Sequence, residues 1–180
     1  MSVEISRIID VVYTRCYEAG CFTSDNEVDF GSGCIASNVQ VHEDAAGLPR
    51  IDDVIRIDGA SSSVRLVISQ FRSDLRSILF EVSSLLPEVR ISDLELFRMS
   101  NHVHRLSGHG RLFINTHDQT WMCHGRLDLD ELATDDGEVQ SSNAGELLSS
   151  TEIEIGLKVF LGVLSSAKQF DRLLREQLLR

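Results

Sequence analysis

The stretch that decides the fold runs from Ser77 to Ala133 and reads SILFEVSSLLPEVRISDLELFRMSNHVHRLSGHGRLFINTHDQTWMCHGRLDLDELA. It begins with alternating apolar residues, continues with apolar residues three and four apart, and ends with two short apolar runs around a polar turn. A period of two is typical of a strand, and spacings of three and four are typical of a helix. The stretch therefore predicts a strand, a helix and a β-hairpin, in that order.

The predicted helix lies between Pro87 and Gly108. The letters SDLE at 92–95 form a capping box, in which the serine hydroxyl accepts from the third amide and the glutamate reaches back. Ile91 before the box and Leu96 after it fit a hydrophobic staple. We therefore expect the helix to begin at this box and to end at the Gly108-His109-Gly110 turn.

The predicted hairpin follows, with a turn at 116–119 and Ile114 placed opposite Met122. This register predicts one face with Phe113, Trp121, Cys123, Leu127 and Leu129, and a second face that is also apolar. A sheet open to water on one side shows polar alternation there, so the second face is expected to be covered, at least in part. We interpret it, with the neighbouring helix, as a partner or dimer interface, or equally as a surface covered by the first or last helix. The predicted interface residues are Leu112, Ile114, Met122, His124 and Met99.

Upstream of this stretch, the residues at 64–68 also alternate and predict a second hairpin with the strand at 78–82. Its predicted register places Ile68 opposite Phe80 and Leu66 opposite Val82, which puts all four side chains on one face. Residues 2–19 have helical apolar spacing, and Gly20 follows where a C-cap belongs. Residues 21–60 predict short strands at most, at 28–30, 39–41 and 54–57.

Downstream, residues 130–150 are rich in Asp, Ser and Gly, and we expect a low-order acidic insertion there. A long final helix is predicted at about 152–179, started by a second capping box of Thr151 and Glu154. Strands and helices thus occur in blocks. The pattern predicts a single α+β domain over 1–180, an antiparallel sheet with helices packed on it, in the order α-βββ-α-ββ-α.

The chain has 180 residues, with 17 Lys and Arg against 28 Asp and Glu, which gives a net charge of −11. This charge argues against a general nucleic-acid binder, because phosphate neutralisation needs clustered Lys and Arg. The acids gather at 23–60 and 128–138, each with a net charge of −6, whereas 61–127 carries +2. A partner that binds the hairpin therefore need not be basic.

Location is predicted from three features. The first ten residues lack the basic and apolar regions of a signal peptide, and no apolar run reaches the length of a membrane span. The cysteines, Cys16, Cys21, Cys34 and Cys123, form no CxxC pair. We expect a cytoplasmic protein with free thiols and no contact with a membrane.

Catalytic and metal-binding motifs are missing from the sequence. There is no HExxH, CxxC, GxSxG or GxxxxGK[ST] motif, and the acidic run at 128–138 lacks EF-hand spacing. We expect no catalytic residues, no cofactor and no metal, and Trp121 is predicted to be a core residue more readily than a partner anchor. A histidine-based, metal-dependent enzyme or regulator is the less favoured alternative, using some of His42, His102, His104, His109, His117 and His124.

The order of strand, capped helix with Asn101 in its middle, glycine turn and hairpin ending in Leu127-Asp128-Leu129 resembles the YbjN family of bacterial sensory transduction regulators. Residues 2–19 and 153–178 match the opening and closing helices of that family. The family is similar in fold to the type III secretion chaperones. The resemblance covers most of 60–180, whereas 20–60 departs from the pattern and the acidic insertion is longer.

The resemblance implies a small, cytoplasmic, non-enzymatic protein in which helices pack on one antiparallel sheet. It implies a homodimer that binds a protein partner or client along apolar patches, in a chaperone-like or regulatory role. It gives no catalytic residue, and Asn101 is implied to be structural. A dedicated chaperone for a secreted effector is the alternative that the resemblance leaves open.

Overall fold

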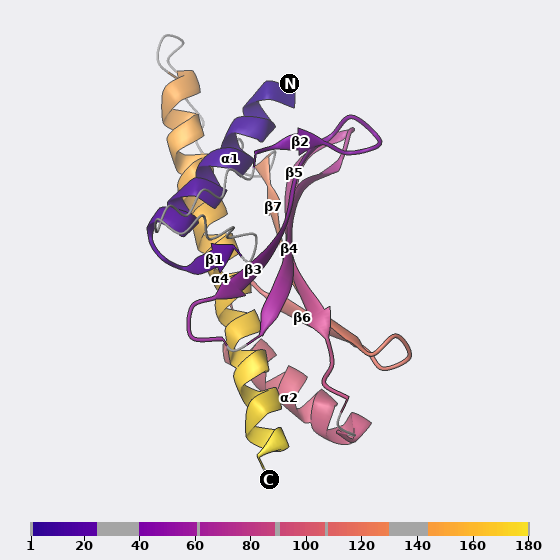
Figure 1. The fold of residues 1–180 in the computed structure, drawn as a ribbon. Helices are drawn as coiled ribbons and strands as arrows, with labels where there is room; N and C mark the ends of the chain where they lie inside the picture. The colour runs from indigo at the N-terminus through magenta and orange to yellow at the C-terminus, as the bar shows by residue number, and fades with distance from the viewer. Residues whose placement is uncertain are drawn as a thin grey trace, which may run out of the picture.

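The computed structural model describes residues 2–24, 40–60, 62–88, 91–106, 108–129 and 144–179 (Figure 1). The helices and strands in these ranges are α1 (Ser2–Glu18), β1 (Phe22–Ser24), β2 (His42–Glu43), β3 (Pro49–Ile57), β4 (Ser63–Arg72), β5 (Leu75–Leu85), α2 (Asp93–Leu106), β6 (Arg111–Asn115), β7 (Thr120–Asp128) and α4 (Ala144–Leu178). The predicted strand at 28–30 and most of the predicted acidic insertion lie outside the described residues.

The strands form one antiparallel sheet, which confirms the α+β prediction. Within the described residues the sheet has seven strands in the order β1-β3-β4-β5-β7-β6, and β2 also pairs with β3. The element order follows the predicted α-βββ-α-ββ-α, with β1 and β2 as short additions at the β3 edge. The predicted strand at 54–57 is the end of a longer strand, because β3 begins at Pro49.

The first hairpin has the predicted register. Leu66 pairs with Val82 and Ile68 pairs with Phe80, and all four side chains are fully buried on one face. Polar residues alternate with these apolar ones, so only one register buries the apolar set. The alternation in the sequence was therefore sufficient to predict this pairing.

The second hairpin has a different register from the predicted one. Ile114 pairs with Trp121 and Phe113 pairs with Met122, one residue away from the predicted pairing of Ile114 with Met122. The turn leaves four residues between Asn115 and Thr120, which form the last pair. A slip of one residue moves a strand's side chains to the opposite face, so the predicted grouping of these residues by face is wrong.

The ends of α1 and α2 follow their local sequence signals. After α1, Gly20 has a φ of +70°, and its N–H donates to the carbonyl of Tyr17 at 2.9 Å, as in a Schellman C-cap. Before α2, the amide of Glu95 donates to the Ser92 hydroxyl at 3.3 Å, and the amide of Ser92 donates to the Glu95 carboxylate at 3.4 Å. The predicted C-cap and the first predicted capping box are confirmed.

The last helix corrects the second capping box. α4 begins at Ala144, so Thr151 and Glu154 lie inside the helix and do not cap its start. The residues before Thr151 include Glu and Leu, which favour a helix, and the helix continues through them. A capping box is a local pattern that can also occur within a helix. None of the helices among the described residues is long and apolar enough to cross a membrane.

The core lies between one face of the sheet and the helices α1 and α4, which cross it side by side (Figure 1). Phe160 of α4 stacks on Phe80 of β5, with 5.2 Å between ring centroids. α4 also approaches β7 closely, because a Cβ at Gly125 would lie 2.8 Å from a methyl group of Val163. Trp121 is 2% exposed and packs against Phe170, so its prediction as a core residue is confirmed.

Candidate functional site

The side of the sheet that faces away from α1 and α4 is the candidate site, and we call it the open face. Its side chains come from the strand positions that alternate with the core. Among the described residues, no helix packs over it. The strand register arranges its residues in three rows across the sheet, which are Val54–Arg65–Ser83–Met122–Phe113, Asp52–Val67–Glu81–His124–Arg111 and Arg50–Ser69–Leu79–Arg126.

Apolar side chains are exposed across the open face. Phe113 on β6 is 52% exposed, and Val54 on β3 and Phe71 on β4 are each 43% exposed. Between them Val67 is only 5% exposed, and Met122 is partly buried. Exposed apolar residues that occur singly are ordinary, whereas contiguous apolar patches mark interaction surfaces. Phe113 and Met122 are paired neighbours at one end of the first row, and Val54 lies at its other end.

An arginine–carboxylate cluster lies at the β3–β4 side of the open face. The Arg65 guanidinium donates to both carboxylate oxygens of Asp52, at 3.0 and 2.7 Å, and Arg50 donates to the same carboxylate at 2.9 Å. These hydrogen bonds, opposed by partial burial, lower the pKa of Asp52 to about 2. Asp52 therefore stays ionised at neutral pH and holds two arginines in place on the surface.

The β6–β7 side of the open face is more aromatic. The Phe113 ring of β6 meets the His124 ring of β7 edge-on, with centroids 4.7 Å apart. From β7, the Arg126 guanidinium reaches across β5 to lie 5.0 Å from the centre of the Phe71 ring on β4. Burial lowers the pKa of His124, helped by the charge of Arg111 and opposed by that of Glu81. His124 is therefore neutral at pH 7 and adds to the apolar character of this side.

The charge of the open face differs from that of the whole chain. Five arginines, at 50, 56, 65, 111 and 126, lie on it with three carboxylates, those of Asp52, Glu81 and Asp128, so its net charge is +2. The whole chain carries −11. The charge of the open face is therefore opposite in sign to that of the whole chain.

The five predicted interface residues do not lie together. Met122 and His124 are on the open face, whereas Leu112, at 3% exposed, and Met99, at 6%, belong to the core, and Ile114 is partly buried against it. The slip in the hairpin register accounts for Leu112 and Ile114, and Met99 is on the buried side of α2. Phe113 lies on the opposite face from the predicted one. Phe71 and Val54 were not predicted, although the alternation along β3 and β4 marks them as residues of the open face.

The outer edge of β6 is partly covered by α2. The amide of Leu112 points away from β7 and donates to Nε2 of His104 on α2 at 2.8 Å. His104 therefore has a structural role here. Because the Leu112 amide is already bonded to it, that amide cannot pair with an added strand. This edge of β6 is therefore less open to strand pairing than the face of the sheet.

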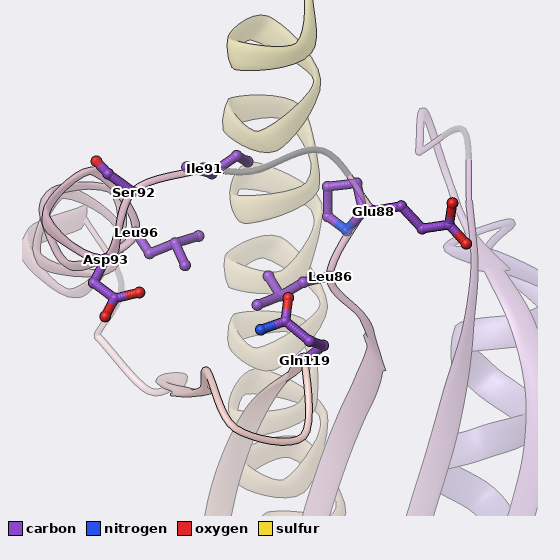
Figure 2. Close-up of a pocket in the computed structure, with 8 residues that line it drawn as sticks. Leu86, Glu88, Ile91, Ser92, Asp93, Leu96 and Gln119 are labelled. Carbon is purple, nitrogen blue, oxygen red and sulfur yellow. The ribbon is translucent and has the colours of Figure 1, made fainter.

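A cavity of about 380 Å³ lies at the end of the sheet, between the end of β5, the start of α2 and the β6–β7 turn. Figure 2 shows Leu86 and Leu96 pointing toward one another across it, with Gln119 below and Glu88 directed outward. Two of its polar groups already have partners: the Leu86 amide donates to the Gln119 carbonyl at 2.7 Å, and Ser92 belongs to the capping box. The cavity is lined by both polar and apolar side chains, and its lining residues form no arrangement of catalytic groups.

The predicted histidine alternative finds no support in the geometry. In the part of the chain that the structure describes, no three His, Cys, Asp or Glu side chains come together as a metal site. His104 accepts from a main-chain amide, His117 lies against its neighbour Asp118, and His124 packs on Phe113. Cys123 is fully buried, and burial raises the pKa of its thiol to about 12.

Comparison with known proteins gives no relative. No family model matches the chain, and neither a curated protein nor a solved structure matches it. The resemblance to the YbjN family and the secretion chaperones therefore stays a prediction.

Proposed function

We propose that this chain is a non-enzymatic protein-binding module, chaperone-like or regulatory, that binds its partner on the open face and self-associates through it. The observation that carries the proposal is the apolar set on that face, with Phe113, Phe71 and Val54 each at least 43% exposed. The helices cover the other face and leave this one to a partner.

The charges of the open face favour a partner segment that is acidic as well as apolar. The arginines favour a segment with Asp or Glu between apolar side chains, because opposite charges steer association and select the partner. The carboxylate of Asp52 holds Arg50 and Arg65 in fixed positions, so little side-chain entropy is lost when an acidic group binds there. The rings of Phe113 and Phe71 are aromatic side chains, a class that is enriched at protein interfaces.

Self-association is the part of the proposal that is tested first. We expect wild-type protein at high micromolar concentration to scatter light as a dimer after size-exclusion chromatography. Phe113→Asp and Met122→Asp should each raise the dissociation constant of the dimer about tenfold or more, since each removes an apolar contact and adds a charged group that must lose its water on association. A wild-type monomer at these concentrations contradicts self-association.

A matched control is available on the helical side. Leu161 of α4 is 43% exposed, as Phe71 is, but it lies on the far side of the molecule from the open face. Leu161→Asp should leave self-association unchanged, and circular dichroism should show all three variants folded. Equal weakening by Leu161→Asp and Phe113→Asp would show that the open face is not the binding surface.

A further inference from the structure

Two cysteines meet at the end of α1. The amide of Cys21 donates to the carbonyl of Cys16 at 3.0 Å, and Gly20 between them has a φ of +70°. With the bond from Gly20 to Tyr17, these are the two hydrogen bonds of a Schellman motif. The motif brings the side chains of its first and last residues into contact, and here both are cysteines.

The two residues lie within the reach of a disulfide. A main-chain hydrogen bond of 3.0 Å between Cys21 and Cys16 keeps their Cα atoms within about 7 Å, given standard backbone dimensions. Disulfides span Cα separations of roughly 4.4–6.8 Å. Burial raises the pKa of the Cys16 thiol to about 12, and the neighbouring Cys21 side chain adds to the rise.

We propose that Cys16 and Cys21 are a modification site, a dithiol that a peroxide converts to a reversible disulfide. The pair differs from Cys123, which is a single buried thiol on the far strand β7. Because the hydrogen bonds of the motif already hold both residues, the disulfide needs a side-chain rotation at Cys21 and no unfolding of α1.

The order of the two steps follows from exposure. Cys21 is partly exposed, whereas Cys16 is 1% exposed, so the Cys21 thiolate attacks an oxygen of the peroxide. An S–O bond forms, the O–O bond breaks, and hydroxide leaves, so sulfur is oxidised and the peroxide is reduced. The sulfur of Cys16 then attacks the sulfenic sulfur of Cys21, and the leaving hydroxide takes the proton of Cys16 to form water. Two thiols and one hydrogen peroxide thus give one disulfide and two waters.

The disulfide would tie α1 to the edge of the sheet. The carbonyl of Cys21 accepts from the amide of Asp58 at 2.9 Å, next to the end of β3. A covalent link from Cys16 to Cys21 therefore restrains the last turn of α1 against β3. Since it closes a short loop in the unfolded chain, we expect oxidation to raise Tm by roughly 5 °C.

Peptide mapping after treatment of the full chain with hydrogen peroxide tests the proposal directly. Free thiols are alkylated, and the protein is digested without reduction by trypsin and a glutamyl endopeptidase, which cut after Arg15, Glu18 and Glu27. We expect residues 16–18 to be joined to residues 19–27, and the link to disappear after dithiothreitol. Cys21→Ser should abolish the link and leave Tm unchanged by peroxide.

Two results would overturn the proposal. One is recovery of Cys16 alkylated while Cys21 is carried on to sulfinic acid. The other is a link from Cys21 to Cys34 or to a second molecule in place of Cys16. A Cys123→Ala variant serves as the matched control, because it also removes one cysteine and should keep the 16–21 link and the rise in Tm.

Discussion

The two faces of the sheet come from alternate residues of the same strands and have opposite properties. On the core face, Phe80, Ile68 and Val82 are fully buried beneath α1 and α4. On the open face, Phe113 and Val54 are exposed, and arginines and carboxylates pair between them.

The difference shows how helix placement divides one sheet into a buried face that stabilises the fold and an exposed face that we propose binds a partner. Side chains on the core face lower the free energy of the folded chain by leaving water. Apolar side chains on the open face contribute little until a partner covers them. Substitutions on the two faces should therefore affect different measurements.

The largest expected effect is a loss of unfolding free energy, and it differs between one phenylalanine from each face. Phe80→Ala removes a ring that is 0% exposed and stacked on Phe160, and should lower the free energy of unfolding by about 4 kcal/mol. Phe113→Ala removes a ring that is 52% exposed, and should cost less than about 1 kcal/mol. Urea unfolding measures both. Equal losses would show that the open face is covered in the folded chain.

The next effect tests the close approach of α4 to the core face. A Cβ at Gly125 would lie 2.8 Å from Val163 and 3.0 Å from Val159, so Gly125→Ala should lower the free energy of unfolding by about 2 kcal/mol.

Gly108→Ala is the control for this substitution, because nothing lies within 4 Å of the added Cβ. It should be neutral or slightly stabilising, by up to about 1 kcal/mol. If Gly125→Ala has the same small effect as Gly108→Ala in thermal and urea unfolding, then α4 does not pack on β7 as described.

The smallest effect concerns the charges of the open face and depends on pH. The folded pKa of Asp52 is about 2, below its ordinary 3.8, so its contribution to stability is present above pH 4 and is lost as the pH falls through 2. Because the carboxylate is partly exposed to solvent, we expect this contribution to be about 1 kcal/mol.

Asp52→Asn should remove that pH-dependent part of the stability between pH 4 and 2, measured by unfolding at a series of pH values. Asp74→Asn is the control, because Asp74 pairs with Arg72 at a fully exposed turn, and we expect no measurable change. A pH profile of Asp52→Asn identical to that of the wild type would contradict the role of the Asp52 cluster.

The two hairpins show when a sequence pattern can predict the register of a strand pair. In the first, polar residues alternate with apolar ones, so the pairing of Ile68 with Phe80 was predicted correctly. In the second, both faces are apolar, so hydrophobicity did not distinguish the two registers and the predicted one was wrong. The four-residue turn between Asn115 and Thr120 was the signal that could have decided it.

The candidate site was predicted only in part for the same reason. Met122 and His124 lie on the open face, whereas Leu112, Ile114 and Met99 pack on the core side. The second capping box failed in a related way, because the start of α4 depends on residues before Thr151 that the local pattern did not include.

The sequence by itself determined the α+β class, the ends of α1 and α2, and the first hairpin, because these depend on residues that are close in the chain. The tertiary structure decided which face of β6 and β7 is buried, because α4 packs on Gly125 and Cys123 from a distant part of the chain. This packing of α4 on the core face leaves Phe113 on the open face. Burial is decided by contacts between distant segments, so the surface proposed for binding could be located only after the helices were placed.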